Sequence, residues 1–148
     1  MLKKSLIEIF ERDLLLLKKE IESYPDENKI WIVKDGINNP AGNLCLHICG
    51  NLQYYIGAIL GNTGYIRKRD EEFSLKNIQR NNLLAEIDKT ISVVKTTLEK
   101  LNPDDFEKEF PIELLNRKWQ TGHFLIHLMA HLNYHIGQIN YHRRLLTS

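Results

Sequence analysis

The sequence predicts an all-α protein, an antiparallel four-helix bundle. Apolar residues recur every three or four positions through four long segments, and proline or glycine punctuates the stretches between them. No segment of convincing length alternates between apolar and polar residues as a strand would. With 148 residues, of which 43% are hydrophobic, the chain can bury one core, so we expect a single domain over residues 1–148.

The first helix is expected over residues 2–23. Its apolar residues fall on one side of a helix, whereas lysines and glutamates occupy the other directions. The helix should end at Tyr24-Pro25, because the residue before a proline is forced out of the α region. The apolar positions are Leu6, Ile9, Phe10, Leu14, Leu17 and Ile21.

The second helix is expected from Pro40 to about Leu60, with Asn39 as its N-cap and the proline at the first helical position. Gly50 and Gly57 lie inside it, and each costs roughly 1 kcal/mol of helix propensity relative to alanine. We therefore expect a neighbouring helix or a ligand to approach closely at these glycines.

The rest of the chain supplies two more helices and two connections. The polar segment 65–73 has no helical period, so we expect an ordered loop there. The third helix is expected over residues 80–101, and an extended crossing over residues 106–118. The fourth helix should begin after Thr121 as its N-cap and run to about Leu146.

Charge and composition exclude several classes of protein. The net charge of +1 comes from 20 basic and 19 acidic residues that are interspersed, so we expect no nucleic-acid partner. No apolar run reaches the roughly 20 residues that cross a bilayer, and charges interrupt any leader-like start, which favours a cytoplasmic protein without a membrane partner. We interpret Cys45 and Cys49 as small buried apolar side chains rather than a disulfide or ligand pair.

Histidines are the candidate metal ligands. Four of those in the fourth helix follow one another at intervals of four residues, so each step turns about 40° around the axis and all four cannot face one ion. An adjacent pair can, and His47 in the second helix could join it, although spacing alone does not choose the pair and single packed histidines are common in bundles. The four are His123, His127, His131 and His135.

Three stretches resemble the DinB/YfiT-like superfamily of helical bundle metalloproteins, especially its short branch. They are residues 39–51, residues 67–73 and the run from His127 to Ile139 that contains Tyr-His-x-Gly-Gln. The resemblance covers nearly the whole chain and implies a divalent metal, Zn or Ni, bound by His47, His131 and His135. Many members carry arginine where this chain has Ile136, so any polar role of that arginine is absent here.

The same resemblance implies positions for the remaining histidines. His127, one turn before His131, is expected beside the ligands or in the core. His123 and His142 are expected to have no part in the site.

The superfamily includes bacillithiol and mycothiol transferases, so the resemblance implies metal-dependent transfer of a low-molecular-weight thiol to an electrophile. A metal held by three imidazoles lowers the pKa of a bound thiol. Such thiols carry carboxylates, and Arg67 and Arg69 are candidates to bind them. Alternatively, these arginines form a surface ion-pair network with Asp70 and Glu72. Tyr134 either hydrogen-bonds the substrate or packs.

Two other functions stay open. The superfamily is named for damage induction, so a non-catalytic metal-binding stress protein is the main alternative. A zinc hydrolase needs a general base, and the run from His131 to His135 lacks the glutamate of HExxH, so only a distant carboxylate, such as Asp70 or Glu72, could serve. The resemblance also implies a homodimer, for which the sequence indicates no interface.

Overall fold

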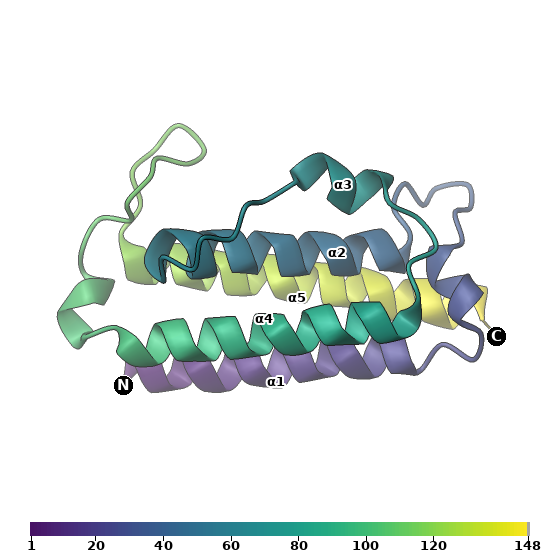
Figure 1. The fold of residues 1–148 in the computed structure, drawn as a ribbon, viewed down its shortest axis with the longest axis horizontal. Helices are drawn as coiled ribbons and strands as arrows, with labels where there is room; N and C mark the ends of the chain where they lie inside the picture. Colours follow the sequence, from purple (N-terminus) through teal and green to yellow (C-terminus); the bar gives the residue numbers. More distant parts are fainter. Residues whose placement is uncertain (148) are drawn as a thin grey trace.

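The computed structural model describes residues 1–147, and the protein is all-α over that range (Figure 1). Within it no β-strand forms, and only two isolated bridges occur. The long helical segments are α1 (Leu2–Glu22), α2 (Ala41–Leu52) with its continuation η2 (Gln53–Leu60), α4 (Arg80–Lys100) and α5 (Thr121–Leu146). The short ones are η1 (Glu27–Trp31), α3 (Arg69–Ser74) and η3 (Pro103–Phe106).

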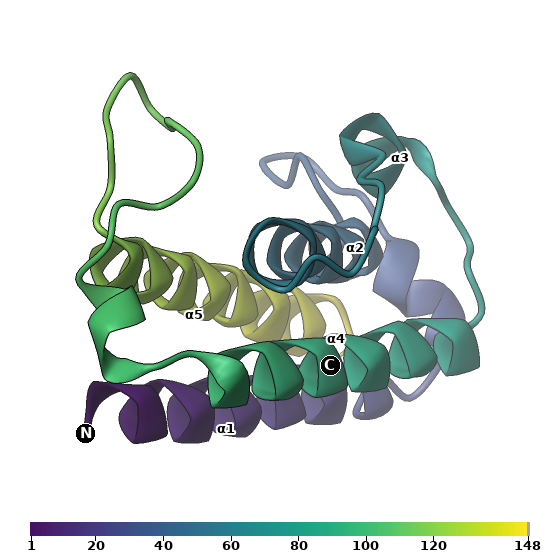
Figure 2. The same cartoon turned by 60° about the vertical axis from the view of Figure 1, so that its left-hand side comes forward.

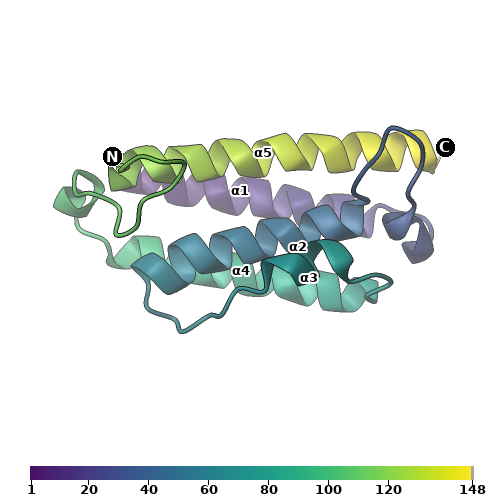
Figure 3. The same cartoon turned by 90° about the horizontal axis from the view of Figure 1, so that it is seen from above.

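The four long segments lie alongside one another around a shared apolar core. They follow the long axis of the molecule (Figure 3), and α2 and α5 lie above α1 and α4 (Figure 2). Both α1 and α2 contact α4 and α5. The predicted apolar stripes point inward, as Leu14 of α1, Ile87 of α4 and Ile139 of α5 show by their complete burial. No helix of the described residues has the length and apolar character needed to cross a membrane.

The extents of three predicted helices are confirmed to within about one residue, but two predicted caps are wrong. Pro40 is itself the N-cap of α2, because its ψ of 165° is extended and the helix therefore starts one residue later. Gln120 is the N-cap of α5, so Thr121 is the first helical residue instead of the cap. Neither N-cap position makes a side-chain capping hydrogen bond.

The second helix is continuous over the predicted range, but its last part winds as a π-helix, η2. The wider turn was not predictable, because the apolar spacing that suggests a helix does not separate α from π winding. The close approach expected at Gly57 is confirmed, since a Cβ atom there would lie 2.8 Å from Cγ1 of Val93 in α4.

The loop expected over residues 65–73 is wrong in part, because residues 69–74 form α3. The sequence of this helix shows no apolar period. Of its six residues only Glu72 is buried. Acidic side chains in its first turn favour it through the helix dipole. Asn43 attaches it to α2 by donating to the carbonyls of Glu72 and Leu75, at 2.9 and 2.8 Å, so α3 lies over α2 (Figure 1).

The segment after η3 leaves the body of the helices as an irregular hairpin-like excursion rather than the expected extended crossing (Figure 2). Isolated bridges between Glu109 and Gln120 and between Leu114 and Arg117 close it. Cys45 and Cys49 are free and buried, as expected. A hydrogen bond to Cys49 and burial both raise the pKa of the Cys45 thiol.

Candidate metal centre

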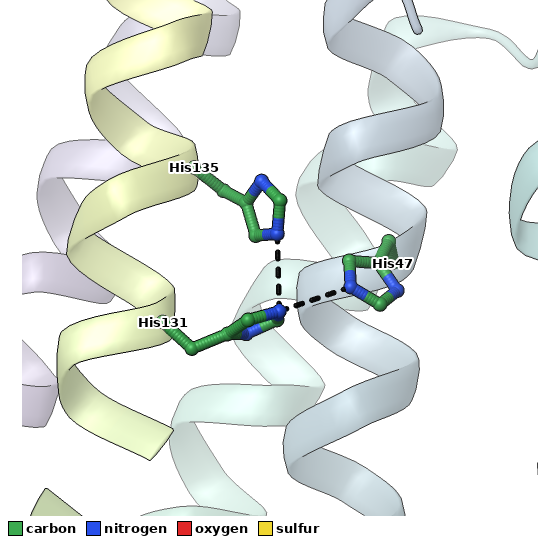
Figure 4. Close-up of side chains that lie close together, drawn as sticks. All are labelled: His47, His131 and His135. Carbon is green, nitrogen blue, oxygen red and sulfur yellow. Dashed lines mark hydrogen bonds between the residues drawn. The ribbon is translucent and has the colours of Figure 1, made fainter. Parts of the chain in front are cut away.

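Three histidines from two helices meet in the structure (Figure 4). His47 belongs to α2, and His131 and His135 lie one turn apart on α5. The Nε2 atom of His131 lies 3.1 Å from Nε2 of His47 and 3.0 Å from Nε2 of His135. Ligand atoms of all three lie within 4.8 Å of one another. Packing of α2 against α5 therefore brings together the pair and the distant third histidine singled out by the resemblance.

The geometry of the three rings fits one ion. Nitrogens about 2.05 Å from the same ion are roughly 2.9 Å apart at a right angle and roughly 3.4 Å apart at the tetrahedral angle. The two short Nε2 separations fall in that range. The ring planes cross at 75°, 86° and 87°, so the imidazoles approach from three different directions. The arrangement leaves further positions around an ion for a substrate or water.

Hydrogen bonds on the far sides of two rings fix where their lone pairs point. Nδ1 of His47 lies 3.0 Å from Oε1 of Glu72, and Nδ1 of His135 lies 2.7 Å from Oε1 of Gln138. Both oxygens accept, so each Nδ1 carries the hydrogen and each Nε2 presents a lone pair. Both lone pairs face Nε2 of His131, which has at most one hydrogen to give. His131 can therefore donate to only one of these lone pairs, whereas a cation placed between the three nitrogens can accept a lone pair from each.

Burial keeps the imidazoles of His131 and His135 in the neutral form that binds metals. Desolvation, reinforced by the neighbouring His135 and His47, lowers the pKa of His131 to about 4. Desolvation also lowers the pKa of His135, against the opposing hydrogen bond with Gln138. At neutral pH both rings are therefore uncharged and available as ligands.

A buried ion pair supports His47 from behind. Arg67 donates to Glu72 through Nε and Nη2, at 2.8 and 3.0 Å. Burial opposes ionisation of Glu72, but hydrogen bonds from His47 and Arg67 prevail and lower the pKa of its carboxyl group. The surface network expected of these residues is thus a buried pair, with side-chain exposures of 10% for Arg67 and 7% for Glu72.

A cavity of about 520 Å³ adjoins the histidines, and His47 and His135 form part of its wall. Arg69 and Phe73 of α3 line it from one side, and the Arg69 guanidinium lies 5.3 Å from the centre of the Phe73 ring. Tyr141 lines it from α5. Sequence reasoning assigned no role to Phe73 or Tyr141, because only the packing of α3 and α5 brings them to the cavity.

Two candidate substrate residues lie elsewhere. Arg67 is outside the cavity wall and contacts Glu72, as described above. Tyr134 is 66% exposed, and its ring lies 5.4 Å from that of His135 on the outside of α5. The structure thus places Arg69, alone among the three predicted substrate residues, in the wall of the cavity next to the histidines.

The remaining histidines lie in different surroundings. His127 is exposed and packs on Trp119 at 5.0 Å between ring centres, so the expectation of a core residue is wrong. His123 contacts the same tryptophan. His142, expected to have no part in the site, lines the cavity. It is buried between the Tyr24 hydroxyl, 2.6 Å from Nδ1, and the Ile32 carbonyl, 2.9 Å from Nε2.

A family model described as protein of unknown function (DUF1572) matches residues 2–148. No protein with a curated description matches the chain.

Proposed function

The chain belongs to the family described as protein of unknown function (DUF1572), a helical family of the DinB/YfiT type, and we propose that it is a metal-dependent thiol transferase. In this proposal His47, His131 and His135 hold one divalent ion, Zn or Ni. The observation that carries it is the convergence of three imidazole nitrogens beside a cavity of about 520 Å³ whose wall contains an arginine. We further propose that the chain forms one antiparallel four-helix bundle domain of the short DinB-like branch.

Once bound, the ion would supply one thing, a lower pKa for a thiol at its open position. The chain supplies the rest. Arg69 offers a planar pair of donors for a carboxylate of the thiol. Leu44 and Phe73 line the cavity and would limit the access of water to the reacting sulfur. The sulfur forms a bond to an electrophilic carbon, the leaving group departs with the bonding electrons, and the thiol proton passes to solvent.

The cavity supports Arg69 over the other two substrate candidates. Arg67 already donates two hydrogen bonds to Glu72, and a substrate carboxylate would have to compete with this buried partner. Tyr134 lies outside the cavity wall. We therefore expect Arg69→Ala to raise the KM for the thiol without changing metal content, because carboxylate binding and metal ligation involve different residues.

Metal analysis of the purified protein, combined with a conjugation screen, tests the proposal. We expect about one divalent ion per chain in the wild type and in His123→Ala, and none in the alanine variants of His47, His131 or His135. Full occupancy in His47→Ala would reject the three-histidine site. Bacillithiol and related thiols are then tested with a panel of electrophiles. If metal-loaded protein shows neither a metal-dependent rate nor saturable thiol binding, the non-catalytic metal-binding stress protein replaces the transferase.

We also propose a homodimer that forms through the outer face of α5. No Asp, Glu, Lys or Arg occurs from Thr121 to His142, although 26% of the chain is charged. Depletion of charge is a mark of protein interfaces, and a neutral face can pair with its own copy without repulsion. The exposed residues that share this face are Ile126, Ala130, Tyr134, Gly137 and Tyr141.

Light scattering after size-exclusion chromatography tests the dimer. We expect a dimer for the wild type at micromolar concentration and a monomer for Tyr134→Lys, which places a charge in the middle of the face. A monomeric wild type, or a Tyr134→Lys variant that still forms dimers, would contradict this interface.

A further inference from the structure

Glu72 of α3 is a buried carboxylate shared between His47 and Arg67, and neither the motif nor the resemblance gives it a role in the metal site. We infer that Glu72 is a positioning residue of the metal centre. It holds the hydrogen of His47 on Nδ1, so that the lone pair on Nε2 faces the ion. The inference rests on the proposed metal site, and its test separates the two.

The hydrogen-bond pattern around the carboxylate allows only one role for His47. Arg67 can only donate, and its Nε and Nη2 groups occupy one side of the carboxylate. Oε1 then lies 3.0 Å from Nδ1 of His47 and accepts the hydrogen from it. Nη2 of Arg67 is also 3.4 Å from Nδ1, but both nitrogens carry hydrogens in this arrangement, so they do not bond.

The surface of α2 is shaped to receive this carboxylate. A Cβ atom on Gly50 would lie 2.0 Å from Oε2 of Glu72 and 2.7 Å from its Cδ, so any larger residue there would displace the carboxylate. Asn43 holds the backbone on either side of the glutamate through the carbonyls of Glu72 and Leu75. Asn43, His47 and Gly50 are spaced four and three apart, which puts them on one face of the helix beneath α3.

The same geometry excludes Glu72 as a ligand of the ion. Its carboxylate contacts Nδ1, whereas the three histidines converge through Nε2. Only His47, His131 and His135 form the cluster that could hold a metal among the described residues. Glu72 therefore acts through His47. Carboxylates that fix the tautomer of a ligating histidine in this way typically change metal affinity by roughly 10- to 100-fold.

Replacing Glu72 by alanine makes the sharpest variant, because it removes the acceptor of the Nδ1 hydrogen. Nη2 of Arg67, 3.4 Å from Nδ1, then loses Oε1 as its partner and can donate to Nδ1, which moves the imidazole hydrogen to Nε2, where it blocks ligation. In Glu72→Gln the amide oxygen can take the place of Oε1 and accept from both Nη2 of Arg67 and Nδ1 of His47, while the NH2 group faces Nε of Arg67. We therefore expect Glu72→Ala to bind metal more weakly than Glu72→Gln.

Two measurements test the inference. Competition with a chromophoric chelator gives the Kd for Zn²⁺, and we expect it to rise roughly 10- to 100-fold in Glu72→Ala and by less in Glu72→Gln. Glu71→Gln, a neighbour on α3 with an exposed side chain, is the matched control and should keep the wild-type Kd. Nitrogen NMR of histidine-labelled, metal-free protein reports the tautomer, which should be Nδ1–H for His47 in the wild type and in Glu72→Gln, and Nε2–H in Glu72→Ala.

The outcomes separate this inference from the proposed function. If the wild type binds no Zn²⁺ or Ni²⁺, the proposed function fails, and the tautomer of His47 in the metal-free protein still decides the role of Glu72. If the wild type binds metal but Glu72→Ala binds it equally well and keeps the Nδ1–H tautomer, Glu72 positions nothing and the inference is overturned.

Discussion

Replacing Gly50 by alanine tests whether α2 must leave room for the Glu72 carboxylate. The new Cβ atom would lie 2.0 Å from Oε2, so the carboxylate must move by about 1.4 Å to reach the 3.4 Å of an ordinary contact. This shift breaks its hydrogen bonds with His47 and Arg67. Hydrogen bonds to charged groups contribute about 1.5–3 kcal/mol each, although a displaced carboxylate recovers part of this through contact with water.

Alanine also gains about 1 kcal/mol of helix propensity over glycine, which opposes the loss. We therefore expect Gly50→Ala to lower the free energy of unfolding by about 1–3 kcal/mol. In a Glu72→Ala background the clash is absent, and the same substitution should be neutral or stabilising by up to about 1 kcal/mol. Urea unfolding of the four metal-free proteins measures both steps. Equal effects of Gly50→Ala in the two backgrounds would refute the reasoning.

Three further predictions concern acidity, metal removal and the buried His142. The unfolded chain protonates His131 near pH 6.5 but the folded protein only near pH 4, so the free energy of unfolding of the metal-free protein should fall as pH drops between these values. Urea unfolding at pH 7, 5.5 and 4.5 should show a shallower fall in His131→Gln. A chelator should lower Tm by roughly 5–10 °C at metal concentrations about 100-fold above Kd, while circular dichroism stays helical. Tyr24→Phe leaves Nδ1 of His142 without its partner at 2.6 Å and should cost about 1–3 kcal/mol in urea unfolding, whereas the exposed Tyr141→Phe should change stability by less than about 0.5 kcal/mol.

The long helices could be predicted because each buries a stripe that recurs at the helical period. Leu83 and Ile87, one turn apart on α4, show the relation directly, since both are completely buried. Spacing on α5 offered several equivalent histidine pairs, and the resemblance was needed to single out His131 and His135. That His47 lies close enough to join them depends on how α2 packs against α5, which spacing alone does not determine.

The residues that support the site could not be predicted from the sequence. Six residues form α3, too few to show a period, and its one buried residue is a glutamate. The role of Gly50 was predicted only in outline, as a close approach, because the approaching group comes from a segment 22 positions away that was expected to be a loop. Tyr141 reaches the cavity through the direction of its side chain on α5, which no motif records.

The attachment of α3 has a consequence for how fast a metal would exchange. A helix of six residues is unstable by itself, so α3 stays folded through its contacts with α2, chiefly those of Asn43 and Glu72. Short segments of this kind open in native proteins at a free energy well below that of global unfolding. Each opening would strip His47 of both Glu72 and the Phe73 ring that packs on it at 4.9 Å. The bound ion would then dissociate at a rate set by the opening of α3, while the long helices remain folded. Hydrogen exchange of the α3 amides can measure that opening.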